Sequence, residues 1–211
     1  MTKILIISDI HGNLEALNSV LEEKYDQVIC AGDLVDYGPN PQEVIDLSKN
    51  FFKIVMGNHD SANAFNIDCQ CSQNFHEYSV ETRNYFRKYI RDLDFLRNLK
   101  MEERFEIDNL KIILVHASLV DPLYDYIFDN IDDNDLMKKF KNTQADIVIF
   151  GHSHHKFFRK VGKTIFINPG SVGQPRDGNH RASYAILDTE SMNVEFKRKD
   201  YDIERTIKKL K

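Results

Sequence analysis

The chain has 211 residues, of which 42% are hydrophobic and 29% are charged, proportions that exclude a disordered or fibrous protein. At about 150 residues per domain, this length predicts one domain spanning residues 1–211. The net charge of −5 argues against a stable nucleic-acid complex, because such proteins are usually basic. The longest early apolar run, Ile4–Ile7, is too short for a signal peptide or a membrane span, so we expect a cytoplasmic protein without membrane contact.

The first part of the chain alternates short apolar strands with amphipathic helices. A strand over Lys3–Ile7 precedes a helix that Asn13 can cap. A second strand over Gln27–Ala31 precedes a helix with Pro41 in its first turn, and a third strand follows over Phe52–Met56. These runs are rich in isoleucine and valine and lack polar alternation, which predicts strands buried on both faces.

The middle of the chain contains one segment without a clear pattern. Residues 61–78 are polar and rich in asparagine, and they predict a loop that is either a lid over an active site or a solvated connector. A long helix is predicted over Ser79–Leu99 from its apolar stripe. Strands over Lys111–Val115 and Asp146–Phe150 then flank a short helix near Leu136.

The end of the chain changes character. The segments Thr164–Ile167, Ser183–Leu187 and Val194–Lys197 predict strands, the last two joined by a turn near Glu190. A closing helix is predicted over Ile203–Leu210. Together the elements predict an α/β fold with an antiparallel part near the C-terminus.

Side chains of metal-ligand type follow each of the five early strands. If these strands are neighbours in a sheet, their carboxyl ends meet at one edge, where open α/β sheets bind ligands. The side chains that would converge there are Asp9, His11, Asp33, Asn58, His116, His152 and His154. Such a buried group needs a compensating cation, and imidazole and carboxylate donors suit a divalent transition metal.

Seven donors are too many for one ion. They fit two ions that share a carboxylate and a solvent oxygen, with the ions roughly 3.5–4 Å apart. Such a pair activates a bridging water as a hydroxide nucleophile and clamps the attacking and leaving oxygens. The reaction that best fits is hydrolysis of a phosphate ester, which needs no serine or cysteine nucleophile. The predicted cofactors are two divalent transition-metal ions, manganese first, with iron, nickel, cobalt or zinc as alternatives.

The order of these motifs resembles that of the calcineurin-like metallophosphoesterase superfamily. The motifs are Asp9-x-His11, Gly32-Asp33, Gly57-Asn58-His59-Asp60, His116 and Gly151-His152-x-His154. The run Asn168-Pro169-Gly170-Ser171, followed by Gly173-Gln174-Pro175-Arg176, is similar to the small YfcE-like phosphodiesterase branch. The resemblance implies a four-layer αββα sandwich with two facing mixed β-sheets.

The resemblance also implies a role for each residue. The first ion would be bound by Asp9, His11 and His154, the second by Asn58, His116 and His152, and Asp33 would bridge both. The same resemblance makes His59 the residue that contacts the phosphate and assists the leaving oxygen, beside Asn58. It makes Asp60 the residue that orients His59; alternatively, Asp60 caps a helix or turn.

Departures from the superfamily's pattern narrow the substrate. Protein phosphatases and diadenosine polyphosphate hydrolases of this superfamily favour an arginine where this chain has Tyr37, and the phosphatases usually have glutamate in place of Asp60. Arg176 either replaces the missing phosphate clamp or is a solvated surface charge, as are His180 and Arg181. We therefore expect phosphodiesters or small nucleotide-like phosphate esters as substrates. The alternatives are a phosphomonoesterase or phosphoprotein phosphatase with the same metal site, and a non-catalytic metal-binding scaffold.

Two further groups of residues leave alternatives open. The pair Cys69-x-Cys71 is either a set of spare reduced thiols or half of a metal site, since it lacks a second pair. The aromatic residues Tyr124, Tyr126 and Phe128 either stack on a base or aryl group, or pack in the core. The sequence also leaves homo-oligomer formation open.

Overall fold

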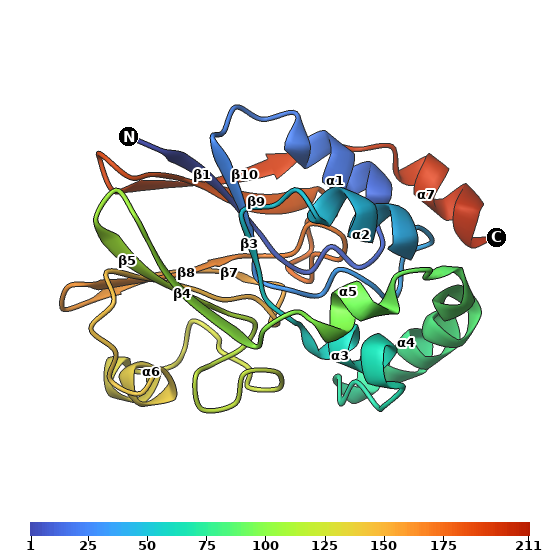
Figure 1. Ribbon diagram of the computed structural model, residues 1–211, viewed down its shortest axis with the longest axis horizontal. Helices are drawn as coiled ribbons and strands as arrows, with labels where there is room; N and C mark the ends of the chain where they lie inside the picture. The colour runs from blue at the N-terminus through green and yellow to red at the C-terminus, as the bar shows by residue number, and fades with distance from the viewer.

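The computed structural model describes residues 1–211 and contains two five-stranded mixed β-sheets that lie face to face (Figure 1). The first sheet has the order β10-β9-β1-β2-β3, formed by Asn193–Lys199, Ala182–Asp188, Lys3–Ile7, Gln27–Cys30 and Lys53–Ile54. The second has the order β4-β5-β6-β8-β7, formed by Glu102–Ile107, Leu110–Val115, Ile147–Ile149, Thr164–Pro169 and Lys156–Val161. Strands β1, β2 and β3 are parallel, as are β5, β6 and β8, and the other pairs are antiparallel.

Successive side chains of a strand point to opposite faces of its sheet, and this alternation builds the layers. In β1, Ile4 and Ile6 pack between the two sheets, while Leu5 and Ile7 pack against α1 (Leu14–Leu21) and α2 (Pro41–Ser48). The outer face of the second sheet is covered by α6 (Asp133–Lys139). The order helix, sheet, sheet, helix confirms the expected αββα sandwich (Figure 1).

Several local predictions are confirmed. The Asn13 side chain accepts a hydrogen bond from the backbone of Ala16 and caps α1, and Pro41 opens α2. The closing helix α7 has the expected bounds, Ile203–Leu210, and the turn between β9 and β10 contains Glu190. None of the helices combines the length and apolar character that a bilayer crossing requires.

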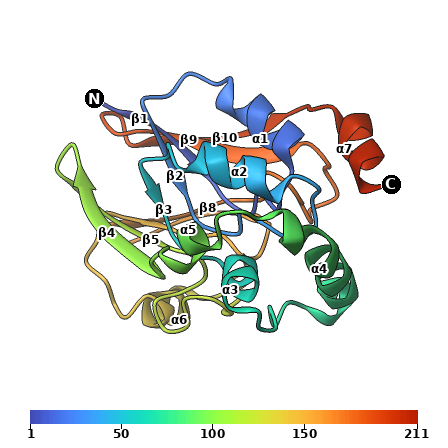
Figure 2. The same cartoon turned by 45° about the vertical axis from the view of Figure 1, so that its right-hand side comes forward.

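The segment after β3 differs from the prediction. Residues 61–78 are not one loop, because α3 (Asn58–Phe65) and α4 (Gln73–Phe86) occupy most of them and leave residues 66–72 as the connection. The expected single helix over Ser79–Leu99 is also wrong. That region is divided into the end of α4, a 3₁₀ turn at Arg87–Tyr89 and α5 (Leu93–Arg97). The helices α3, α4 and α5 lie together at one side of the sheets (Figure 2).

A hydrogen-bonding network explains the break in this helix. The backbone of Ile90 is extended, and Gln42 accepts hydrogen bonds from the N–H groups of Arg91 and Asp92. The Asp92 carboxylate then accepts from Phe95 and caps α5. The polar partners that end one helix and begin the next therefore come partly from α2, which is distant in sequence.

Two strands, β4 and β7, were not predicted. Both are edge strands of the second sheet, and both alternate exposed with partly or fully buried residues. The expected strand Phe52–Met56 is shortened to Lys53–Ile54, and Val55 and Met56 pair instead with Lys100.

Candidate metal centre

Six of the predicted ligands lie on the loops that follow β1, β2, β5 and β6, and Asn58 is the first residue of α3, which follows β3. Five of the seven adopt a left-handed backbone with φ between 50° and 66°: Asp9, His11, Asp33, His152 and His154. This conformation is unfavourable for residues with a Cβ, and costs of order 1–3 kcal/mol each when the surrounding structure imposes it. Such a concentration of unfavourable backbone at one edge of the sheets is typical of a functional site.

The first group of donors consists of Asp9, His11 and His154. The Nε2 atoms of the two histidines are 3.2 Å apart, and His154 Nε2 lies 3.4 Å from Asp9 Oδ1. Each ring holds its Nδ1 atom near a backbone carbonyl, His11 at 3.0 Å from Val35 and His154 at 2.6 Å from Gln174. Because a carbonyl can only accept, Nδ1 carries the proton and the Nε2 lone pairs face each other.

Burial makes this first group ready for a cation. It lowers the pKa of His11 to about 3 and holds the pKa of His154 well below its usual value, so both rings are neutral. Burial also raises the pKa of Asp9 to about 6. Two neutral imidazoles with facing lone pairs repel each other unless a positive ion lies between them and the carboxylate.

The second group consists of Asn58, His116 and His152. His116 Nε2 lies 3.1 Å from Asn58 Oδ1 and 3.1 Å from His152 Nδ1. His116 Nδ1 lies 2.7 Å from the carbonyl oxygen of Ala31, and the Asn58 amide donates to the carbonyl of Cys69 at 2.7 Å. These outer contacts direct the amide oxygen of Asn58 and Nε2 of His116 toward the same point.

Asp33 lies between the two groups. Its Oδ2 atom is 3.8 Å from His11 Nε2 and 3.4 Å from His116 Nε2, and no group donates a hydrogen bond to it. Asp9 Oδ1 and His152 Nε2 are also buried without a partner. Buried polar atoms are normally hydrogen-bonded, so these orphaned atoms fit a centre that binds cations. The structure thus brings all seven predicted ligands together, in two groups around one carboxylate.

His59 lies beside the first group at the start of α3. Its ring is perpendicular to that of His11, with 5.0 Å between ring centroids, and its backbone N–H donates to Asp33 Oδ1. Its Nδ1 atom is 2.8 Å from Asp36 Oδ2. Burial lowers the pKa of His59, but the charges of Asp33 and Asp36 outweigh burial and raise it overall. The ring is therefore disposed to carry a proton.

The residue that orients His59 is Asp36, not Asp60. The Asp36 carboxylate accepts hydrogen bonds from Asn63 of α3 and Ser79 of α4, at 2.7 and 3.0 Å, and lies 3.6 Å from Arg83. Sequence reasoning missed Asp36, although it stands in the same loop as Asp33. Its left-handed backbone, with φ of 71°, turns the carboxylate toward His59 in a way that spacing alone does not reveal.

Asp60 instead holds the loop that carries Asp33. Its carboxylate accepts hydrogen bonds from the backbone N–H groups of Asp33, Leu34, Val35 and Gly57, at 2.8 to 3.3 Å. This agrees with the alternative that Asp60 caps a turn or helix. The predicted role of orienting His59 is wrong, because both carboxylate oxygens of Asp60 face backbone amides.

The run Asn168-Pro169-Gly170-Ser171 at the end of β8 also holds the loops of the centre. Asn168 donates to the carbonyl of Gly151, and Ser171 donates to the carbonyl of Asp9, at 2.6 and 2.7 Å. The loops bearing the first and last ligands are thus tied to one segment. The sequence indicated this run only as a resemblance, since its partners lie far away in the chain.

The residues considered for substrate contact are placed unequally. The Arg176 guanidinium lies 4.0 Å above the ring of Phe75 and is held by Gln174, while its Nε atom is buried without a partner. Burial lowers the pKa values of His11, His152 and His154, and the positive charge of Arg176 lowers them further. Gln174, which holds Arg176, also accepts from His154 through its backbone carbonyl. His180 is exposed, and the Arg181 side chain donates to neighbouring Asn179.

The three aromatic residues do not belong to the core. Tyr126 packs against the ring of His152, with 4.1 Å between centroids, and stacks at 5.9 Å on Phe128, which is 44% exposed. Tyr124 is partly exposed. The alternative of core packing is therefore not borne out, and Tyr126 and Phe128 form a partly exposed aromatic surface beside the second group.

Comparisons with known proteins identify relatives of this chain. The profile described as the calcineurin-like phosphoesterase superfamily domain matches residues 2–192. An uncharacterized protein of Methanocaldococcus jannaschii is 34% identical over 98% of this chain and 91% of its own length. Phosphodiesterase YfcE of Escherichia coli is 24% identical over 92% of this chain and 91% of its own. A crystal structure of a metallophosphoesterase from Sphaerobacter thermophilus superposes with a TM-score of 0.81 at 28% identity, covering 99% of this chain and 92% of that one.

Proposed function

Because this chain belongs to the calcineurin-like phosphoesterase superfamily and is a hydrolase of phosphoester bonds, we propose that it cleaves phosphodiesters or small nucleotide-like phosphate esters with two divalent metal ions. The observation that carries the proposal is the position of the Asp33 carboxylate between two groups of buried donors. One atom of each group, Asp9 Oδ1 and His152 Nε2, has no hydrogen-bond partner in the protein, and neither has Asp33 Oδ2. A single ion would leave one of the two groups uncompensated.

The donor sets indicate the class of ion. Asp9, His11 and His154 would hold one ion, and Asn58, His116 and His152 the other, with Asp33 shared. Nitrogen and oxygen donors without thiolate suit manganese, our first choice, and also iron, nickel, cobalt or zinc. When bound, such ions lower the pKa of water toward neutrality and neutralise the charge of a phosphate.

His59 supplies what the metal ligands do not. With Nδ1 facing Asp36, only Nε2 is free to donate a proton to the oxygen of the departing alcohol. The charges of Asp33 and Asp36 outweigh burial and raise the pKa of His59, which favours the protonated ring that a proton donor requires. Asn63, Ser79 and Arg83 hold the Asp36 carboxylate in place, so the direction of the His59 ring is set by four buried side chains.

Two features favour a phosphate ester that carries an aromatic or nucleoside group. Tyr126 and Phe128 offer an exposed aromatic surface next to His152, suited to a base or an aryl group. Arg176 offers a guanidinium that suits a phosphate oxygen. The relative named as a phosphodiesterase is consistent with a diester, although its own identity to this chain is low.

The test is a rate comparison with protein reconstituted with manganese. We expect faster release of p-nitrophenol from the bis-ester of phosphate than from the mono-ester, and turnover of small nucleoside diesters. Preference for the mono-ester would favour a phosphomonoesterase. Failure on every ester, with metal content confirmed, would favour the non-catalytic scaffold and refute the proposal.

A further inference from the structure

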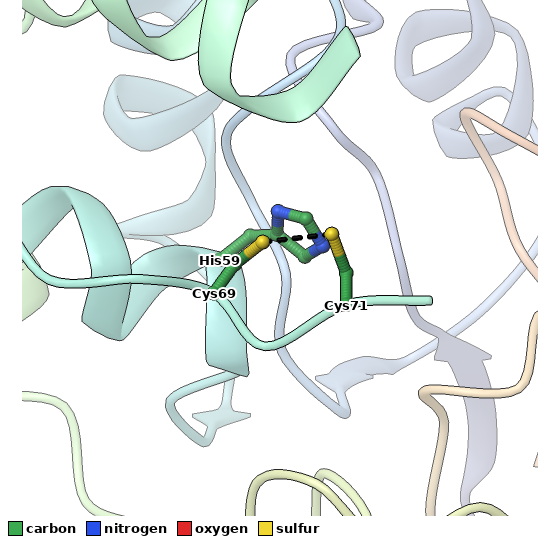
Figure 3. A group of neighbouring side chains, drawn as sticks. All are labelled: His59, Cys69 and Cys71. Carbon is green, nitrogen blue, oxygen red and sulfur yellow. Dashed lines mark hydrogen bonds between the residues drawn. The ribbon is translucent and has the colours of Figure 1, made fainter. Parts of the chain in front are cut away.

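A separate group of donors lies beside His59, outside the two groups of the metal centre. The Sγ atoms of Cys69 and Cys71 are 2.8 Å apart, and these atoms and a ring nitrogen of His59 all lie within 4.8 Å of one another (Figure 3). Both cysteines belong to the short connection between α3 and α4. Gln70 between them adopts a left-handed φ of 48°, and its N–H donates to Asp68, a turn that brings the thiols together.

Oxygen donors surround the thiols and His59. Ser79 Oγ lies 3.4 Å from Cys69 Sγ and 3.3 Å from His59 Nδ1. The Tyr37 side chain is buried, and its hydroxyl has no hydrogen-bond partner. Burial raises the pKa of Tyr37, and so does the neighbouring Cys71 thiol. Buried polar atoms are normally hydrogen-bonded, so the unpaired Tyr37 hydroxyl is free to contact a ligand bound beside the thiols.

The group can be reached from the surface. A cavity of about 440 Å³ is lined by Cys71 together with Asp68, Gln70, Gln73, His76 and Glu77. Cys71 is 9% exposed there, whereas Cys69 is fully buried behind it. The carboxylates of Asp68 and Glu77 at this entrance favour approach of a cation over approach of an anion.

We propose that Cys69, Cys71 and His59 bind a thiophilic divalent cation such as Zn²⁺, and that its binding inhibits the enzyme. Two thiolates and an imidazole are the donors that zinc and its heavier relatives prefer over manganese. The Tyr37 hydroxyl is a fourth donor beside them. The inhibitory part rests on the proposed function of His59, whereas the binding of the cation does not.

Binding requires a small rearrangement. With Zn–S bonds of about 2.3 Å in tetrahedral geometry, the two sulfurs would be roughly 3.8 Å apart, so the thiols separate by about 1 Å. Gln70 is exposed and can move with the turn. Coordination through either ring nitrogen of His59 disables the acid, because Nε2 is the proton donor and Nδ1 is the atom that Asp36 holds.

The test uses Cd²⁺ as a spectroscopic probe on manganese-loaded protein whose thiols have been reduced with a phosphine. The wild type should develop a thiolate-to-cadmium charge-transfer absorption that saturates with one further ion per chain. Cys71→Ser should lose most of this absorption and bind at least roughly tenfold more weakly, the loss that even a change outside the ligand sphere can bring. Cys30→Ala is the matched control, since Cys30 lies buried in β2 within the core and should leave the absorption intact.

Inhibition is measured on the same samples, relative to the activity of each variant. Cd²⁺ or Zn²⁺ should inhibit the wild type and Cys30→Ala at lower concentration than Cys71→Ser. Bound cadmium should also slow alkylation of the thiols in the wild type, a readout that needs no variant. The site is overturned if the wild type shows neither the cadmium absorption nor slower alkylation of its thiols. It is also overturned if oxidation of Cys69 and Cys71 to a disulfide accounts by itself for the lost activity. Absorption with unchanged activity overturns the inhibition, and absorption in a protein inactive on all esters refutes the proposed function but not the site.

Discussion

The ion pair between Asp36 and His59 offers the sharpest test of how this centre works. Asp36→Asn keeps the size of the side chain and a carbonyl oxygen for hydrogen bonds, but it removes the negative charge 2.8 Å from His59 Nδ1. Neither residue is a proposed ligand of the two catalytic metal ions. We therefore expect the variant to retain its metal ions and to lose proton donation.

The size of the effect follows from the charge. An opposite charge within this distance changes the pKa of a partner by about 1–3 units, so the ratio of protonated to neutral His59 should fall about 10- to 1000-fold. General acid catalysis is worth roughly 100- to 10,000-fold, which leaves room for the whole of this loss on a nucleoside or alkyl diester. A p-nitrophenolate leaving group hardly needs the proton, and its rate should fall less than about tenfold.

The assay is kcat for both substrates in the wild type and the variant, together with elemental analysis. The negative charge of Asp36 helps to raise the pKa of His59 in the wild type. Loss of that charge in Asp36→Asn should therefore also move the alkaline limb of the kcat profile to lower pH. Asp60→Asn is the contrasting variant and should lose metal, since Asp60 holds the backbone on both sides of Asp33. Equal losses on both substrates in Asp36→Asn, with full metal content, would refute proton donation by His59.

Further changes probe the metal centre itself. Asp33→Asn should weaken both ions and abolish activity, because a neutral amide cannot balance two cations; two full equivalents of metal with normal turnover would contradict the shared carboxylate. Gly57→Ala should lower metal content, since the added Cβ would lie 2.0 Å from Asp33 Oδ1. Gly162→Ala is the control, because the added Cβ would meet open space. Its φ of +58° should lower the free energy of unfolding by only about 1–2 kcal/mol, and activity should be kept. Metal affinity measured by calorimetry should fall as pH falls through about 6, because burial raises the pKa of Asp9 to about 6 and a proton then competes with the cation; affinity independent of pH between 5 and 7 would exclude Asp9 as a ligand. Tyr126→Ala should raise KM for nucleoside and p-nitrophenyl esters more than for an alkyl ester without an aromatic ring, and equal changes would remove Tyr126 from stacking on the substrate.

Much of the fold and the ligand set could be predicted from local sequence. Runs of isoleucine and valine that end in aspartate, asparagine or histidine indicated buried strands with ligands at one edge, and all seven ligands do converge there. Short-range signals were equally informative: Asn13 caps α1 and Pro41 opens α2, because capping depends on neighbours within one turn. Edge strands β4 and β7 carry many charged residues and gave no such signal.

Relations between distant segments could not be predicted in this way. The break between α4 and α5 depends on Gln42, which lies some 50 residues earlier in the chain, so the continuous apolar stripe of that region suggested one helix. The proximity of Cys69 and Cys71 to His59 likewise depends on how α3 leads into the following turn. A spacing of two cysteines says nothing about which third donor they meet.

The sequence by itself determined the types of the predicted ligands and their order at the strand ends, because the end of an apolar run is a local property. The four layers were implied only by the family resemblance, since the strand pattern alone predicted no more than an α/β fold. The tertiary structure alone decided which of two nearby carboxylates serves His59. Asp60 stands next to His59 in the chain, yet its position on α3 directs it to the backbone amides of the Asp33 loop. Asp36 is distant in sequence, but its left-handed backbone and its contacts with Asn63 and Ser79 bring its charge to the imidazole. Side-chain direction at such a site depends on packing between elements, and for that reason only the folded chain reveals it.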